Sequence, residues 1–241
     1  MKLTKKQIIY IDDYIKYHKV KYWDIRIELL DHIVTSVEEK LEKGISFDDA
    51  IIEMHKSFGN SMKMLWNSGI EYSIFANGDG YKDLIQKKLK EINKKHRNFF
   101  TKEVINFFKS FKNISLLGTL YFMNYLLFNN VEYILFKRIN IIIFFIPSVF
   151  ILIFFILNFV RKNHSIQLEY SLFYATFPVL LLNMFIQKIN PDGIFNVTIE
   201  IQKIVMFTVV PLNLVLSYCG LILYIKAHEK YTNIFKQLQS L

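Results

Sequence analysis

Four long stretches without a charged residue restrict what this chain can fold into more than any other feature of its sequence. They contain 19, 22, 18 and 22 residues and run over residues 113–131, 139–160, 170–187 and 204–225. Because an α-helix rises about 1.5 Å per residue, roughly 20 apolar residues cross the hydrocarbon core of a bilayer. A soluble protein would need a large polar shell to bury four such helices, and the rest of this 241-residue chain does not supply one. The expected transmembrane helices lie at about 113–134, 139–160, 168–187 and 204–225.

Basic residues near the ends of these stretches predict how the chain crosses the membrane. Nine lie on the side that includes both termini: Arg97, Lys102, Lys109, Lys112, Arg161, Lys162, Lys226, Lys230 and Lys236. Four lie on the other side: Lys137, Arg138, Lys188 and Lys203. Since cytoplasmic loops carry the excess of lysine and arginine, both termini are expected in the cytoplasm. The charged N-terminal sequence holds no signal-peptide core, so a multi-pass protein of the cell inner membrane is expected.

Residues 1–60 have the apolar spacing of three short amphipathic helices. Thr4 and Gln7 predict a capping box at the start of the first helix. A second helix is expected from about residue 24 to 43, and Ser46 is expected to cap a third that ends at Gly59. The fold class is therefore all-α: a cytoplasmic three-helix module, a basic juxtamembrane helix and a four-helix transmembrane bundle.

The segment 61–112 is expected to be a linker followed by a basic amphipathic helix, and residues 226–241 a cytoplasmic tail. Residues 81–112 hold ten basic and three acidic residues, a net charge of +7, whereas residues 1–80 have a net charge of −2. Nucleic-acid binding is one interpretation of this charge, but the adjacent span favours anionic lipid headgroups, at about 1 kcal/mol per basic residue. The lipid-facing basic candidates are Lys94, Lys95, Arg97, Lys102, Lys109 and Lys112.

Asparagine recurs across the four predicted spans, at Asn124, Asn158, Asn183 and Asn213, and Asn124 and Asn213 lie near the middle of their spans. Such side chains usually form hydrogen bonds between transmembrane helices, worth about 1 kcal/mol. Proline inside three of the spans predicts kinks, at Pro147, Pro178 and Pro211. Asp, Glu, Lys and His are absent from the central part of every predicted span, which argues against an ion-coupled transporter.

Glu28, Asp31 and His32 share one face of the second predicted helix, and Asp24 extends that face by one turn. Carboxylate and imidazole groups at this spacing are a weak candidate for a metal site, because a site needs three or four converging ligands. His18 and His55 would add ligands only if the fold brought them close. The stronger interpretations are a hydrogen-bonded Asp/His pair and a surface that binds a partner, with no cofactor expected.

A series of short motifs carries a resemblance to a known module. The residues Glu28-Leu-Leu-Asp31-His32, Gly44-Ile-Ser46, Ala50 and Phe58-Gly59-Asn60 resemble the helix-turn-helix-associated α-helical signalling domain of bacteria and the prefix domain of some ABC-type permeases. The chain also resembles integral membrane proteins common in Bacteroidota. The resemblance implies a membrane-tethered adapter or regulator, in some cases beside a PadR-type transcription regulator.

Motifs typical of enzymes are absent from the sequence, including GxSxG, Walker A, GxGxxG and HExxH. We therefore expect a non-enzymatic membrane adapter or regulator that presents its cytoplasmic module to a protein partner, such as a transcription regulator, without binding nucleic acid itself. The alternative is a small transport or channel subunit in which the kinked spans and their asparagines form a pathway.

Overall fold

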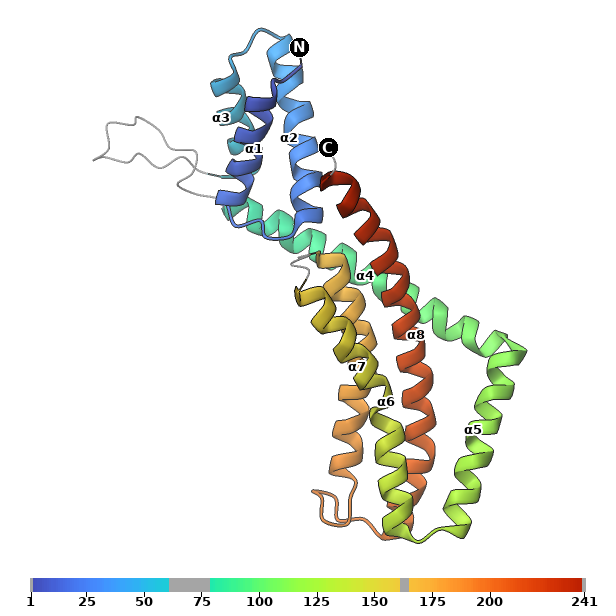
Figure 1. The fold of residues 1–241 in the computed structure, drawn as a ribbon. Helices are drawn as coiled ribbons and strands as arrows, with labels where there is room; N and C mark the ends of the chain where they lie inside the picture. The colour runs from blue at the N-terminus through green and yellow to red at the C-terminus, as the bar shows by residue number, and fades with distance from the viewer. Residues whose placement is uncertain (1, 61–78, 161–164, 240–241) are drawn as a thin grey trace. The chain divides into compact units, whose positions relative to one another are not determined.

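The computed structural model describes residues 2–60, 79–160 and 165–239 and is all-helical over them (Figure 1). The eight helices in these ranges are α1 (Lys5–Tyr17), α2 (Trp23–Glu42), α3 (Phe47–Ser57), α4 (Asp79–Lys109), α5 (Phe111–Asn130), α6 (Tyr133–Val160), α7 (Ile166–Lys188) and α8 (Ile199–Gln239). The linker part of the predicted segment 61–112, residues 61–78, lies outside the described residues.

The chain divides into two compact units. The N-terminal unit comprises Met1–Ile92 with His164–Ile166, and the membrane unit comprises Asn93–Asn163 with Gln167–Leu241. The long helix α4 begins in the first unit and ends in the second. Each unit has its own buried apolar residues, so each is described separately.

The first three helices of the N-terminal unit begin where the sequence predicts. The side chain of Thr4 accepts a hydrogen bond from Gln7 N, and the Gln7 side chain accepts one from Thr4 N, which completes the capping box of α1. Ser46 caps α3 in the same way by accepting from Asp49 N. Gly44 and Gly59 follow α2 and α3 with φ of 82° and 77°, the left-handed conformation that ends many helices.

Apolar side chains at helical spacing form the core of this unit. Ile11, Tyr14 and Ile15 of α1 are buried, as are Ile25, Leu29, Ile33 and Val37 of α2 and Ala50, Ile51 and Met54 of α3. Each helix therefore buries one stripe and leaves a polar face exposed.

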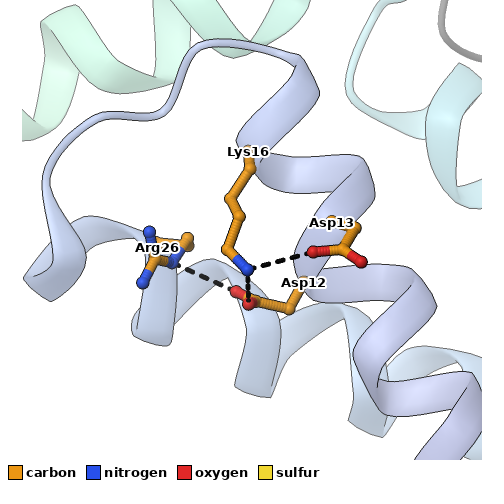
Figure 2. Close-up of polar contacts among 4 residues, drawn as sticks. All are labelled: Asp12, Asp13, Lys16 and Arg26. Atoms are coloured by element: carbon orange, nitrogen blue, oxygen red, sulfur yellow. Dashed lines mark hydrogen bonds and ion pairs between the residues drawn. The ribbon is translucent and has the colours of Figure 1, made fainter.

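An ion-pair group at the edge of this core joins α1 to α2 (Figure 2). The carboxylate of Asp12 lies 2.6 Å from Lys16 Nζ on its own helix and 3.1 Å from Arg26 Nε on α2. Lys16 Nζ also lies 3.0 Å from the Asp13 carboxylate. Because all four side chains are partly exposed, the group orients the two helices and adds only a small stabilisation.

Three helices of the membrane unit are long and apolar enough to cross a membrane: α6, α7 and α8. They pack through a cluster of buried residues that includes Phe144 and Ile151 of α6, Ala175 of α7 and Val210 of α8. Their outward surfaces carry exposed large apolar side chains, such as Ile142 and Leu180. Such surfaces are stable in contact with lipid and costly in contact with water.

The helix α5, expected to be the first of four spans, is not among these three. Its sequence includes Asn113, Asn124, Asn129 and Asn130, and these polar residues lower its mean hydropathy. At 20 residues it is nevertheless about 30 Å long, the thickness of the hydrocarbon core. The four-span arrangement therefore stays a prediction.

Two boundaries differ from those expected. The basic helix does not continue into the first apolar stretch, because α4 ends at Lys109 and Ser110 adopts an extended conformation before α5 begins. The residues expected to form a separate tail after residue 225 extend α8, which is one helix of 41 residues to Gln239. Both differences arise because uncharged stretches mark where apolar surface lies, whereas helix ends depend on backbone hydrogen bonds.

Candidate functional sites

A buried chain of hydrogen bonds lies at the centre of the N-terminal unit. The hydroxyl oxygen of Tyr14 is 2.6 Å from His55 Nδ1 and 2.7 Å from the hydroxyl oxygen of Tyr81. Tyr14, His55 and Tyr81 are 2%, 0% and 1% exposed. The three side chains come from α1, α3 and α4, so one polar chain joins three helices.

Aromatic rings surround this chain. The His18 ring lies 4.7 Å from the Tyr14 ring and 5.2 Å from the Tyr81 ring, measured between centroids. Phe58 lies 5.0 Å from Tyr81. The ring of His18 is also 5.6 Å from that of His55, so the fold brings these two histidines together.

Burial keeps both tyrosines of the chain protonated. It raises the pKa of Tyr14 well above its ordinary value of 10, and the neighbouring Tyr81 raises it further. Burial raises the pKa of Tyr81 to about 12, against a smaller lowering by its hydrogen bond to Tyr14. Because no member of the chain reaches solvent, the cluster is suited to hold the start of α4 against α1 and α3 and not to bind a substrate.

The predicted face of α2 contributes to a small groove in the N-terminal unit. Glu28 and His32 line this groove of about 200 Å³, together with Ile25, Leu29, Leu84 and Lys88. Glu28 forms an ion pair with Lys88 of α4, which raises the pKa of that lysine. The ring of His32 packs edge-on against Phe58, with 5.9 Å between centroids.

The remaining acids of this face do not join Glu28 and His32. Asp31 is exposed. Asp24 accepts hydrogen bonds from Ser165 Oγ at 2.8 Å and from the backbone N–H of Ile166 at 3.3 Å. Over residues 2–60, 79–160 and 165–239, no group of three His, Cys, Asp or Glu side chains is arranged to hold a metal ion. The weak metal candidate formed by Glu28, Asp31 and His32 therefore gains no support, with or without His18 and His55.

Within the membrane unit, one side of α4 packs against α7 and α8. Tyr174 of α7 donates to Asn93 Oδ1 at 2.7 Å, and His96 Nε2 donates to Gln167 Oε1 at 2.9 Å. Further along α4, Glu103 forms an ion pair with Lys226 of α8 at 2.8 Å. Phe107 completes this side by packing with Val215 and Cys219 of α8.

The predicted basic candidates occupy other sides of the same segment. Exposed side chains include all six of them: Lys94, Lys95, Arg97, Lys102, Lys109 and Lys112. The apolar residues of this amphipathic segment separate into two groups. Phe100, Val104 and Phe107 pack into the unit, whereas Phe108 and Phe111 are 48% and 86% exposed. The basic side chains and the two exposed phenylalanines therefore lie on the surface of the unit, and their contact with lipid stays a prediction.

Two of the predicted asparagines form hydrogen bonds between helices. Asn213 Nδ2 of α8 donates to the carbonyl oxygen of Phe144 in α6 at 2.9 Å, and Asn124 Nδ2 of α5 donates to that of Phe207 in α8 at 3.5 Å. Asn183 accepts from Gln187 one turn along α7, at 3.4 Å. The side chain of Asn158 lies outside the described residues.

Sequence reasoning missed the hydrogen bonds that Tyr14 makes with His55 and Tyr81. From the sequence, His55 is only a possible extra metal ligand. Tyr81 lies 67 residues after Tyr14, and no periodicity joins residues so far apart. The one available signal is the presence of tyrosine and histidine at core positions, since a buried tyrosine hydroxyl usually has a hydrogen-bond partner.

No protein-family model, curated protein or solved structure matches this chain.

Proposed function

We propose that the chain is a non-enzymatic adapter or regulator of the bacterial inner membrane, which holds its N-terminal unit in the cytoplasm for a protein partner. The observation that carries this proposal is the division of the chain into two compact units, one with a polar surface and the other with helices apolar enough for a membrane. The resemblance of residues 3–60 to a bacterial signalling module agrees with it. A transcription regulator is the kind of partner that this resemblance implies.

The surface proposed for the partner includes the predicted candidates Glu28, Asp31 and His32. Its four acids, Glu28, Asp31, Glu39 and Glu42, are called the acidic face of α2 below. All four residues are exposed and recur at helical spacing along one side of α2. A partner with a basic surface is favoured by charge complementarity, which raises the association rate and suppresses binding of other acidic surfaces.

Two features of the membrane unit favour an adapter over the alternative of a transport or channel subunit. Asn124 and Asn213 use their side-chain amides in contacts between helices, as a bundle without a pathway does. A cavity of about 420 Å³ in this unit is lined mainly by apolar side chains. A pathway for a polar solute needs polar groups at mid-membrane.

The proposed partner surface is tested by photo-crosslinking of the full-length protein in native membranes. A photoreactive amino acid replaces Thr35, which is exposed at the centre of the acidic face, and in a control it replaces the exposed Lys6 of α1. We expect a crosslinked protein from position 35 that is lost in the variant D31K/E39K. The variant D13K/D48K has the same charge change on α1 and α3 and should retain it. Failure to obtain any crosslink that depends on the acidic face would refute the proposal.

The proposed topology, with α5 as a span and both termini cytoplasmic, is tested by labelling introduced cysteines with an impermeant maleimide. The buried Cys219 is replaced by serine first. Cysteines at Glu132 and Asp192 then report the two loops after α5 and α7. With four spans both are labelled from outside intact cells and a cysteine at Asp31 is not. With three spans both loops share the side of Asp31, and neither is labelled.

A further inference from the structure

A lateral crevice in the membrane unit is enclosed by parts of four helices. It has a volume of about 420 Å³ and is called the α5–α8 crevice below. Its lining consists of Phe107 of α4, residues 112–120 of α5, residues 146–150 of α6 and residues 214–221 of α8, thirteen side chains in all: Phe107, Lys112, Asn113, Leu116, Leu117, Leu120, Ile146, Pro147, Phe150, Leu214, Val215, Tyr218 and Leu221.

The crevice lies in the part of the unit where α5 and α8 diverge. Near the other end of α5, Lys203 Nζ of α8 donates a hydrogen bond to the carbonyl oxygen of Phe128 at 2.6 Å. Tyr121 packs edge-on against Phe207 of α8, with 5.5 Å between ring centroids. Figure 1 shows α5 and α8 separating from there toward the start of α5. The helix α5 thus contacts α8 near its C-terminal end, and the crevice lies beside its first three turns, where Leu117 also packs toward Val215 and Cys219.

The polar groups in the lining belong to Lys112, Asn113 and Tyr218, and the exposed Lys112 lies at the rim. Lys112 and Asn113 belong to the first turn of α5, and this turn has no acidic residue. Tyr218 is 48% exposed and packs edge-on against Phe107. All other lining side chains are apolar, so the crevice combines an apolar interior with a cation at its rim. Lys109, on the last turn of α4, is a further exposed positive charge three residues before Lys112.

The dimensions of the crevice exclude a partner helix. One turn of helix with its side chains, about 10 Å wide and 5.4 Å long, already occupies roughly 420 Å³. The lining of α8 extends over residues 214–221, which is about 10 Å of helix. A transmembrane helix of a partner or of a second copy would therefore not fit, whereas an extended hydrocarbon chain is narrow enough.

We propose that the α5–α8 crevice binds one acyl chain of an anionic glycerophospholipid, whose headgroup phosphate pairs with Lys112. The apolar interior provides the site for the chain, and the lysine at the rim selects the charge of the headgroup. The proposal is independent of the partner of the N-terminal unit. It assigns to Lys112 a role that differs from the general attraction of lysines to the membrane surface.

The test uses purified full-length protein in phosphatidylcholine vesicles that contain a trace of phosphatidylglycerol with a diazirine on its acyl chain. Phosphatidylcholine with the same diazirine is the comparison probe. We expect crosslinks to concentrate on α5, α6 and α8 residues of the crevice, with about fivefold more from phosphatidylglycerol, the factor that one lysine near an anionic headgroup supplies. Leu214→Trp fills the crevice and should abolish these crosslinks. Ile142→Trp, at a 66% exposed position of α6 outside the crevice, should not.

Lys112→Gln separates the headgroup contact from binding of the chain. It should remove the fivefold preference for phosphatidylglycerol while crosslinks from phosphatidylcholine stay unchanged. The control Lys188→Gln on α7 should retain the preference. Crosslinks spread evenly over the lipid-facing surface, or unchanged in Leu214→Trp, would mean that only bulk lipid is present and would overturn the proposal. A preference that survives Lys112→Gln, or no preference in the wild-type protein, would overturn the assignment of the headgroup. Circular dichroism and thermal midpoints of all variants verify that they fold.

Discussion

The side-chain amide of Asn213 on α8 and the backbone carbonyl oxygen of Phe144 on α6 are joined by a hydrogen bond of 2.9 Å. Phe144 lies three residues before Pro147, in a turn whose backbone hydrogen bonding the proline interrupts. Both Asn213 and Phe144 are buried. A side chain of one helix therefore supplies a hydrogen bond near the point where the proline of its neighbour removes one.

Replacing Asn213 by leucine should destabilise the membrane unit by about 1 kcal/mol, because a buried carbonyl group loses a hydrogen bond in an apolar environment. The measurement is the thermal unfolding midpoint of the full-length protein in detergent. Asn183→Leu serves as the control, since Asn183 is bonded only along its own helix at 3.4 Å. An equal loss of stability in the two variants would show that the hydrogen bond between α6 and α8 adds no measurable stability.

Gly220 of α8 lies against the backbone of α7, and replacing it by alanine should separate these helices. An added Cβ would lie 2.6 Å from the Cα of Ala175 and 2.7 Å from the carbonyl oxygen of Tyr174. Because the opposing atoms belong to a backbone, the helices must shift, at a cost of about 1–3 kcal/mol. The matched control is Gly118→Ala on α5, where an added Cβ has no atom within 4 Å.

The two glycine variants should change thermal stability in opposite directions. Alanine favours the helical backbone over glycine by up to about 1 kcal/mol, so Gly118→Ala should raise the unfolding midpoint. Gly220→Ala gains the same preference for the helical backbone, but its Cβ collides with the backbone of α7. The unfolding midpoint of this variant should therefore fall. A rise in both variants would contradict the close approach of α7 and α8.

The parts of the fold that follow from local sequence could be predicted. The caps at Thr4 and Ser46 and the glycines after α2 and α3 act on backbone groups within a few residues, so their spacing identifies the ends of the helices. Apolar periodicity likewise identified which stripe of α2 is buried. Length and lack of charge identified α6, α7 and α8 as candidate spans.

Contacts between distant segments could not be predicted in this way. The amphipathic pattern of α4 predicted which residues are basic and apolar, but it did not distinguish apolar residues that meet lipid from those that meet α8. Phe107 is buried against Val215, whereas the adjacent Phe108 is 48% exposed. Only the positions of α7 and α8 decide this, and they depend on packing over more than 100 residues of sequence.

Replacing Tyr14 by phenylalanine should destabilise the N-terminal unit by about 1–3 kcal/mol. The variant keeps the ring but removes the hydroxyl group that bonds to His55 at 2.6 Å and to Tyr81 at 2.7 Å, and it leaves both partners buried. Hydrogen exchange of the full-length protein in detergent should show loss of protection at the start of α4. Tyr17→Phe, at a 60% exposed position, should leave exchange unchanged.

The stability of the membrane unit should fall as the pH falls below about 6.5, because His96 is buried as the neutral imidazole. Burial lowers its pKa from 6.5, and the positive charge of Lys95 lowers it further, whereas the hydrogen bond to Gln167 raises it. Between the unfolded and the folded pKa, the unfolded chain binds a proton that the folded protein does not. The stabilisation by the neutral His96 is therefore fully present above the pKa of the unfolded chain. It is lost as the pH falls from that pKa to the lower pKa of the folded protein.

This dependence is measured as the thermal midpoint of the full-length protein in detergent between pH 7.5 and pH 5. His96→Gln removes the titrating group, so the midpoint of this variant should fall less over the window than that of the wild-type protein. Lys95→Gln keeps the histidine but removes the neighbouring charge, which should bring the folded pKa closer to 6.5 and weaken the dependence in part. Identical pH profiles for the wild type and His96→Gln would mean that the histidine is protonated as readily in the folded protein as in the unfolded chain, contrary to its burial between α4 and α7.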